Sequence, residues 1–206
     1  MHLQLSDNLV AMGKLIMIRH GESEGNRDRR FTISPDVPIT ELGRRQALEA
    51  ATLIARRFHP RLIISSPFRR ARQTSEIIGE SLKLPIEVVF DLHERDLGHL
   101  KGESYDALHE LARKDPVYNP SQGWLWKPEG GESYEDVRQR VVAAIEQVRT
   151  RYPDDELVVV SHGGVMLSMW AHVIGHWDGA HLPANCGIVL IEHDRSGYQT
   201  PVPIAN

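Results

Sequence analysis

Cysteine is almost absent from this sequence, since Cys186 is the only one among 206 residues. A single cysteine cannot form a disulfide within the chain, and no Cys-x-x-Cys pair offers the usual spacing of a zinc site. Disulfide-stabilised secreted scaffolds and zinc-ribbon proteins are therefore excluded. We expect a protein of a reducing compartment, with the cytoplasm as its simplest location.

The sequence also lacks a strong excess of charge and any long apolar run. Its formal net charge is −4 at pH 7, which gives no general attraction for nucleic acid or for an anionic membrane, so any anion site must be local. No run reaches the roughly 20 apolar residues that cross a bilayer. The N-terminal stretch lacks a basic start and its apolar run is interrupted by Lys14, which makes it a poor signal peptide.

Length and composition indicate one domain spanning residues 1–206. Of the residues, 41% are hydrophobic and 25% are charged, which is ordinary for one globular core of this size. Residues 1–13 precede the first convincing strand and contain a second methionine, Met12. We interpret them as a flexible N-terminal extension or an over-long gene start, and assign them no function.

Short apolar segments alternate with longer helical patterns. Expected strands occupy residues 15–18, 62–64, 86–90, 157–160 and 188–191, and expected helices occupy residues 40–58, 68–81, 133–152 and 163–174. Each apolar segment is too short for a stable helix and is bounded by polar or turn residues. This alternation predicts an α/β fold: a three-layer α/β/α sandwich with a mainly parallel central sheet and helices on both faces.

Residues 100–131 interrupt the alternation. Their second half, 116–131, is rich in proline and glycine and contains Trp124 and Trp126, which predicts irregular structure with an apolar surface. We interpret residues 100–131 as a lid-like insertion.

Histidines and arginines directly follow three of the expected strands. Arg19 and His20 follow the first strand, and His162 and Gly163 follow the strand at 157–160. Arginines also open the helix after the strand at 62–64, where the helix dipole would favour acidic residues. Ligands of open α/β sheets bind beyond the carboxyl ends of the strands, so a bound anion would resolve that conflict.

This set of side chains suits phosphoryl transfer, which needs a nucleophile, positive charge around the phosphoryl oxygens and an acid for the leaving oxygen. A neutral imidazole is a competent nucleophile near pH 7, and guanidinium neighbours favour its neutral form. Glu94 and Asp96, which follow the expected strand at 86–90, place carboxyl groups at the same edge of the predicted sheet. An extended segment turns Glu94 away from His93 and Arg95, which favours Glu94 as the acid, with Asp96 as the substitute. No metal is required, and none is predicted.

In order and spacing these motifs resemble the histidine phosphatase superfamily, within the branch that includes cofactor-dependent phosphoglycerate mutase. The matching segments are Arg19-His20-Gly21-Glu22-Ser23, Ser66-Pro67-Phe68-Arg69-Arg70-Ala71-Arg72-Gln73-Thr74, Leu92-His93-Glu94-Arg95-Asp96-Leu97-Gly98 and Ser161-His162-Gly163-Gly164. The resemblance runs from about residue 14 to about residue 191. It implies a phosphoglycerate mutase-like fold.

The resemblance implies a role for each matching residue. His20 is the nucleophile that becomes phosphorylated, Glu94 is the acid and His162 is the second catalytic histidine. The implied phosphate ligands are Arg19, Arg70, Ser23, Asn26 and Gly163. For Ser23 and Asn26 the alternative is that they cap a turn. Arg27, Arg29 and Arg30 form a charge run that is not ranked among the ligands.

The function indicated first is a metal-independent phosphomonoester hydrolase that acts through a phosphohistidine. A cofactor-dependent phosphoglycerate mutase is the alternative, which alone would need 2,3-bisphosphoglycerate. Such mutases are longer and carry a basic insertion, although Arg113 and Lys114 could serve as cationic anchors. A non-catalytic phosphoprotein-binding module is a remote alternative, because it would be free to lose the nucleophile or the acid.

We expect a small phosphorylated substrate as the partner, without nucleic acid or membrane. Trp124 and Trp126 motivate the further hypothesis that an apolar or ring-bearing leaving group packs against them. The oligomeric state is left open, a homodimer being the commonest assembly for a soluble enzyme.

Overall fold

A computed structural model of the chain describes residues 12–32 and 34–205. In this part of the chain, seven strands form one sheet in the order β3-β2-β4-β1-β5-β6, with β7 also paired to β5. The strands are β1 (Gly13–Arg19), β2 (Leu62–Ser65), β3 (Ile86–Val88), β4 (Glu156–Ser161), β5 (Ile188–Asp194), β6 (Gly197–Tyr198) and β7 (Val202–Ile204). Residues 1–11 of the predicted N-terminal extension lie outside the described residues.

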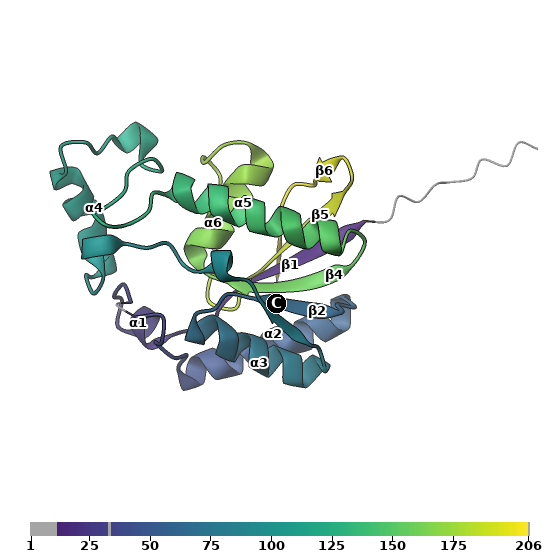
Figure 1. Cartoon of the computed structure of the whole chain (residues 1–206). Coiled ribbons are helices and arrows are strands. Elements are labelled where there is room, and N and C mark those ends of the chain that lie inside the picture. The colour runs from purple at the N-terminus through teal and green to yellow at the C-terminus, as the bar shows by residue number, and fades with distance from the viewer. Residues whose placement is uncertain (1–11, 33, 206) are drawn as a thin grey trace, which may run out of the picture.

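Helices cover both faces of the sheet. The helices are α1 (Glu24–Arg27), α2 (Glu41–Arg57), α3 (Arg69–Leu82), α4 (Tyr105–Lys114), α5 (Tyr134–Arg151) and α6 (Gly163–Ile174). In Figure 1, α2 and α3 lie on one side of the sheet, and α5 and α6 lie on the other. The predicted α/β/α sandwich is confirmed. None of the described helices is long and apolar enough to cross a bilayer.

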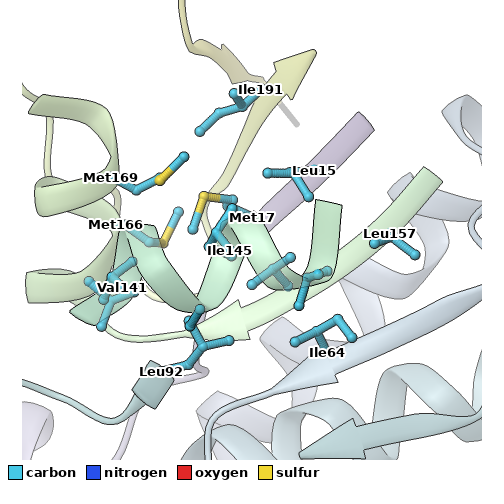
Figure 2. Close-up of a cluster of buried hydrophobic side chains, with 14 of the residues drawn as sticks. Leu15, Met17, Ile64, Leu92, Val141, Ile145, Leu157, Met166, Met169 and Ile191 are labelled. Carbon is cyan, nitrogen blue, oxygen red and sulfur yellow. The ribbon is translucent and has the colours of Figure 1, made fainter. Parts of the chain in front are cut away.

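The strands serve two apolar cores because successive side chains point to opposite faces of a sheet. Leu15 and Met17 of β1 pack with α5 and α6, as the cluster in Figure 2 shows. Ile16 and Ile18, their neighbours in sequence, pack with α2 and α3 instead. A strand buried on both faces reads as a continuous apolar run, which is why this segment could be predicted from sequence alone.

Local signals in the sequence set the ends of the principal helices. The Thr40 side chain accepts a hydrogen bond from the Gly43 N–H at the start of α2, and Ser133 forms a capping box with Asp136 at the start of α5. Helix α6 ends at Gly175, whose φ of 82° lies in the left-handed region that glycine adopts freely. These ends fall within one residue of the predicted boundaries.

Three details of the sheet and its insertion differ from the sequence-based expectation. Strand β3 is shorter than residues 86–90 and is not buried, since it lies at the edge of the sheet and Phe90 is 71% exposed in a 3-10 turn (Phe90–Leu92). Strands β5, β6 and β7 pair antiparallel, whereas β3, β2, β4 and β1 are parallel. The insertion contains a regular helix, α4, whose apolar residues pack around Leu100, Ala112 and Trp126.

Candidate active site

The carboxyl ends of the parallel strands meet at one edge of the sheet. His20 follows β1, Arg70 lies in the first turn of α3 after β2, and His162 follows β4. Glu94 comes from the segment after β3. These four side chains line or adjoin one cavity of about 520 Å³. The structure therefore brings together the residues that the strand-end rule selected.

His20 is 3% exposed and its ring is oriented by the backbone. Its Nδ1 lies 2.8 Å from the Gly21 carbonyl oxygen, which can only accept, so Nδ1 carries the proton. The Nε2 lone pair then faces the Arg70 Nε–H at 3.1 Å. Burial, then Arg70 and Arg19, hold the pKa of His20 well below its ordinary value, opposed only by the hydrogen bond to Gly21. The result is a neutral imidazole whose free nitrogen is directed into the site.

Arg19 and Arg70 present donors that nothing in the described protein satisfies. Arg70 is 3% exposed and its Nη1 has no partner among the described residues. Arg19 donates from Nη1 to the Pro183 carbonyl oxygen at 2.9 Å, while its buried Nε has no such partner. Burial lowers the pKa of Arg70 to about 10, so it remains charged at neutral pH. Because an unsatisfied buried donor costs about 1–3 kcal/mol, these groups favour a bound anion.

Helix α3 explains why only one of its arginines reaches the site. Arg69 and Arg72 are exposed, and Arg72 pairs with Glu76 on the same helix. Arg70 points inward, and its guanidinium lies 5.1 Å from the centre of the Phe68 ring. The first turn of α3 has no acidic residue, so nothing on that turn neutralises Arg70.

His162 is fully buried beside the candidate nucleophile. The two ring centroids are 5.2 Å apart in an edge-on arrangement. Its Nε2 lies 2.7 Å from Ser66 Oγ, and its Nδ1 has no partner among the described residues. Burial, followed by Arg70 and His20, keeps the pKa of His162 well below its ordinary value. The Phe68 ring also lies edge-on to His162, with ring centroids 5.3 Å apart. The sequence did not predict the contacts of Ser66 and Phe68 with His162.

Glu94 reaches the site at the N-terminus of α6. Its Oε1 accepts from the Gly164 N–H at 3.1 Å and from the Arg95 N–H at 2.8 Å. A Cβ at position 164 would lie 2.5 Å from the same oxygen, so this close approach requires glycine. Burial opposes the charged form of Asp96, but Lys101 and the Gly98 N–H lower its pKa overall. The charged form of Asp96 is therefore favoured, which makes Asp96 a poor proton donor.

An ion pair fixes the segment that carries Glu94. Arg140 of α5 pairs with Glu132 at 2.7 Å, and their side chains are 15% and 20% exposed. Arg140 also donates to the carbonyl oxygens of His93 and Glu94, while Glu132 accepts from the Asp96 N–H. The two side chains together bind the backbone on both sides of the acid. Sequence reasoning missed both residues.

We predict that Arg140→Met lowers kcat by roughly 10- to 100-fold with little change in KM, because small displacements of a catalytic group cost that much. The loss should be larger for an alkyl phosphate than for p-nitrophenyl phosphate, whose leaving group needs less protonation. Steady-state rates on both esters measure this. Arg138→Met is the matched control, since Arg138 pairs on the same helix with Glu135 and lies outside the cavity. Because Glu94 also serves the second step, which is common to both esters, the comparison uses kcat/KM, which reports the first step alone. Equal losses of kcat/KM on both esters would contradict the positioning role.

Ser23 and Asn26 line the cavity, but they also form the turn that sequence reasoning gave as the alternative. Ser23 caps α1 in a capping box with Asn26. Asn26 donates to the Tyr105 hydroxyl at 2.9 Å and accepts from the Asn185 side chain at 3.0 Å. Asn185, which was not predicted, also donates to the His20 carbonyl oxygen. A phosphate contact from Ser23 or Asn26 remains a prediction.

Several charged candidates lie outside the cavity. Arg27 pairs with Asp28, Arg29 pairs with Asp106, and Arg30 donates to the Gly102 carbonyl oxygen. Arg113 and Lys114 are exposed on α4 and do not line the cavity either. The cationic anchors suggested for a mutase are therefore not where the substrate would bind.

The predicted role of the two tryptophans is wrong. Trp126 is 8% exposed within the core of the insertion and donates to Asp115 at 2.9 Å. Trp124 stacks on Trp177, with ring centroids 6.3 Å apart. Neither lines the cavity, because Trp126 packs within the core of the insertion and Trp124 stacks on a residue beyond the end of α6.

A buried neutral histidine, guanidinium groups with unsatisfied donors and a nearby carboxyl group are the groups that phosphoryl transfer through a phosphohistidine requires. Among the described residues, no group of three or more His, Cys, Asp and Glu side chains is placed to hold a metal ion. A sequence profile of the histidine phosphatase superfamily (branch 1) matches residues 15–202. The chain belongs to this family.

Several named phosphatases are similar to this protein over most of the chain. A glucosyl-3-phosphoglycerate phosphatase of Mycolicibacterium vanbaalenii is 32% identical over 79% of this chain and 74% of its own. A metal-independent phosphoserine phosphatase of Arabidopsis thaliana is 31% identical over 78% of this chain and 68% of its own. Among solved structures, a mycobacterial glucosyl-3-phosphoglycerate phosphatase in complex with VO3 has a TM-score of 0.78 at 26% identity, covering 94% of this chain and 98% of that chain.

Proposed function

We propose that this protein is a metal-independent phosphomonoester hydrolase that works through a phosphohistidine on His20. The observation that carries the proposal is the orientation of His20: its protonated Nδ1 is fixed by the Gly21 carbonyl oxygen, and its free Nε2 faces Arg70 in a cavity lined by Glu94. The named phosphatases among its relatives support the same reaction.

The proposed reaction has two steps. In the first, His20 Nε2 attacks phosphorus, the bond from phosphorus to the ester oxygen breaks, and Glu94 gives its proton to the departing alcohol. In the second, Glu94 takes a proton from water, which attacks the phosphohistidine and releases inorganic phosphate and free His20. Arg19, Arg70 and His162 stabilise the charge on the phosphoryl oxygens. Gly163, at the N-terminus of α6, adds a backbone donor.

Hydrolysis is favoured over mutase activity because, among the described residues that line the cavity, Lys101 and Arg95 are already bound to other groups of the protein and are not free for a substrate carboxylate or a second phosphate. Lys101, which lines it, is paired with Asp96 at 2.7 Å. Under this proposal no organic cofactor takes part, and 2,3-bisphosphoglycerate would be needed only by a mutase. The substrate is a small phosphorylated molecule.

The proposal is tested by hydrolysis of p-nitrophenyl phosphate in the presence of EDTA, followed by assays on 3-phosphoglycerate with and without 2,3-bisphosphoglycerate. We expect ester hydrolysis that EDTA does not inhibit and no isomerisation that depends on bisphosphoglycerate. Slow hydrolysis combined with bisphosphoglycerate-dependent isomerisation would favour the mutase. Phosphate binding without turnover on any ester would instead favour the binding module.

The pH profile should reflect the buried histidines. Because the pKa of His20 is lowered, the neutral nucleophile persists below pH 6.5. The acid limb of kcat/KM is therefore expected below that value, after correction for the substrate's own ionisation.

The same lowered pKa values affect stability. Below about pH 6.5, the unfolded chain binds more protons on His20 and His162 than the folded chain does. The free energy of unfolding should therefore fall as the pH drops through that value. Rate profiles and denaturant titrations between about pH 4.5 and about pH 8 measure both, because this range spans the ordinary titration of histidine. An enzymic acid limb above pH 6.5 would contradict the neutral nucleophile.

A further inference from the structure

The cavity extends beyond the candidate phosphate site into an apolar region. We propose that the leaving group is an uncharged alcohol that carries a ring or a bulky apolar portion; this inference rests on the proposed hydrolase function. The apolar and aromatic lining residues are Phe31, Phe68, Leu97, Tyr105, Leu108, Tyr134 and Leu182. A volume of about 520 Å³ exceeds what a phosphoryl group alone would fill, and such pockets are usually sized for the whole ligand.

Phe31 and Tyr105 contact each other in this apolar wall. Their ring centroids are 4.8 Å apart and the rings are tilted by 55°. Phe31 exchanges backbone hydrogen bonds with the segment before α4: its N–H donates to the Glu103 carbonyl oxygen, and its own carbonyl oxygen accepts from the Gly102 N–H. The wall is thus held in place before a ligand binds, which reduces the entropy cost of binding.

The same wall is linked to the candidate phosphate site. The Tyr105 hydroxyl accepts from Asn26, whose turn directly follows the His20 segment. Leu108 lies one turn after Tyr105 on α4, and both line the cavity. An ester held with its phosphorus at His20 would therefore place its alcohol portion toward α4.

Two cationic side chains that line the cavity near this wall already have partners within the protein. Lys101 is paired with Asp96. Arg95 is 8% exposed, donates to the carbonyl oxygens of Glu132 and Trp126, and lies 4.2 Å from the centre of the Tyr134 ring. A carboxylate or a second phosphate on the leaving group would lose water here without gaining a free cation, which is costly. The arrangement selects against anionic leaving groups.

The test compares three primary alkyl esters of similar leaving-group chemistry: 2-phenylethyl phosphate, ethyl phosphate and 3-phosphoglycerate. We expect kcat/KM for 2-phenylethyl phosphate to exceed that for ethyl phosphate by about tenfold or more, because an apolar pocket discriminates by about 1–3 kcal/mol for each well-packed group. 3-Phosphoglycerate should be no better than ethyl phosphate. Preference for 3-phosphoglycerate, or equal kcat/KM for the two uncharged esters, would overturn the inference.

Substitutions in the apolar wall test whether this wall causes the preference for 2-phenylethyl phosphate. Phe31→Ala and Leu108→Ala should each lower the ratio of kcat/KM for 2-phenylethyl over ethyl phosphate by about fivefold. Phe90→Ala and Leu125→Ala are matched controls outside the cavity, where these side chains are 71% and 50% exposed, and they should leave the ratio unchanged. A preference that survives both cavity variants would overturn the assignment of this wall. Failure of the wild type to hydrolyse any of the three esters would instead overturn the proposed function itself.

Discussion

Replacing His20 with alanine is expected to lower hydrolysis of every phosphate ester by roughly four orders of magnitude or more, because removal of a nucleophile removes the covalent route altogether. His20 is the buried side chain whose free nitrogen faces Arg70. A water molecule in place of the ring would lack the orientation that the Gly21 carbonyl oxygen gives to His20. The measurement is kcat/KM for p-nitrophenyl phosphate and for an alkyl phosphate, with EDTA present.

His176→Ala is the matched control for this substitution. His176 is exposed beyond the end of α6 and does not line the cavity, so its loss should leave the rates unchanged. Thermal unfolding of both variants separates a lost nucleophile from a lost fold. Turnover by folded His20→Ala at more than about one hundredth of the wild-type rate would contradict the covalent mechanism.

The second large effect is expected for Glu94→Gln, which keeps an oxygen for the Gly164 and Arg95 N–H groups but removes the proton. General acid catalysis typically contributes 10²- to 10⁴-fold, so alkyl phosphate hydrolysis should fall within that range. The first step should be less affected for p-nitrophenyl phosphate, because nitrophenolate leaves without protonation. The second step still lacks its base, so rapid mixing should show a burst of nitrophenolate followed by slow turnover.

Asp96→Asn distinguishes the two carboxyl groups that the sequence left open. Asp96 is bound to Lys101 and to the Gly98 N–H, which stabilise its charged form. Its replacement should therefore leave both the burst amplitude and the preference among leaving groups close to those of the wild type. If Asp96→Asn, and not Glu94→Gln, produced the loss on alkyl phosphates, the acid would have to be reassigned.

The candidate site could be predicted largely because its residues sit at the ends of buried strands. Continuous apolar runs such as the one in β1 mark strands covered on both faces, and parallel strands bring their carboxyl ends to one edge. Arg19, His20 and His162 follow such strands directly, so their convergence follows from the fold. Arg70 stood out from Arg69 and Arg72 only through the family motif, and the structure shows that it alone of the three is buried.

Contacts between side chains far apart in the sequence could not be predicted from the sequence. Arg140 and Glu132 bind the backbone around Glu94 from α5, and no local pattern distinguishes them from an ordinary surface ion pair. Asn185 reaches the His20 carbonyl oxygen across a sequence separation of 165 residues. Such contacts depend on tertiary packing, which sequence periodicity does not report.

The aromatic residues illustrate the same limit. Trp124 and Trp126 suggested an apolar surface for the substrate, yet Trp126 packs in the core of the insertion and Trp124 stacks on Trp177. Phe31 and Tyr105, for which the sequence predicted no role in binding, form the apolar wall of the cavity instead. The expectation of an apolar binding region thus survives as a proposal, but on different side chains.

The most direct test of the mechanism is to trap the covalent intermediate. Wild type and Glu94→Gln are mixed rapidly with a labelled phosphate ester, quenched in alkali, where phosphohistidine survives, and mapped by peptide mass spectrometry. We predict label on His20, more of it in Glu94→Gln than in wild type, and none in His20→Ala. Label on another residue, or efficient turnover by wild type with no labelled enzyme under any condition, would contradict the phosphohistidine mechanism.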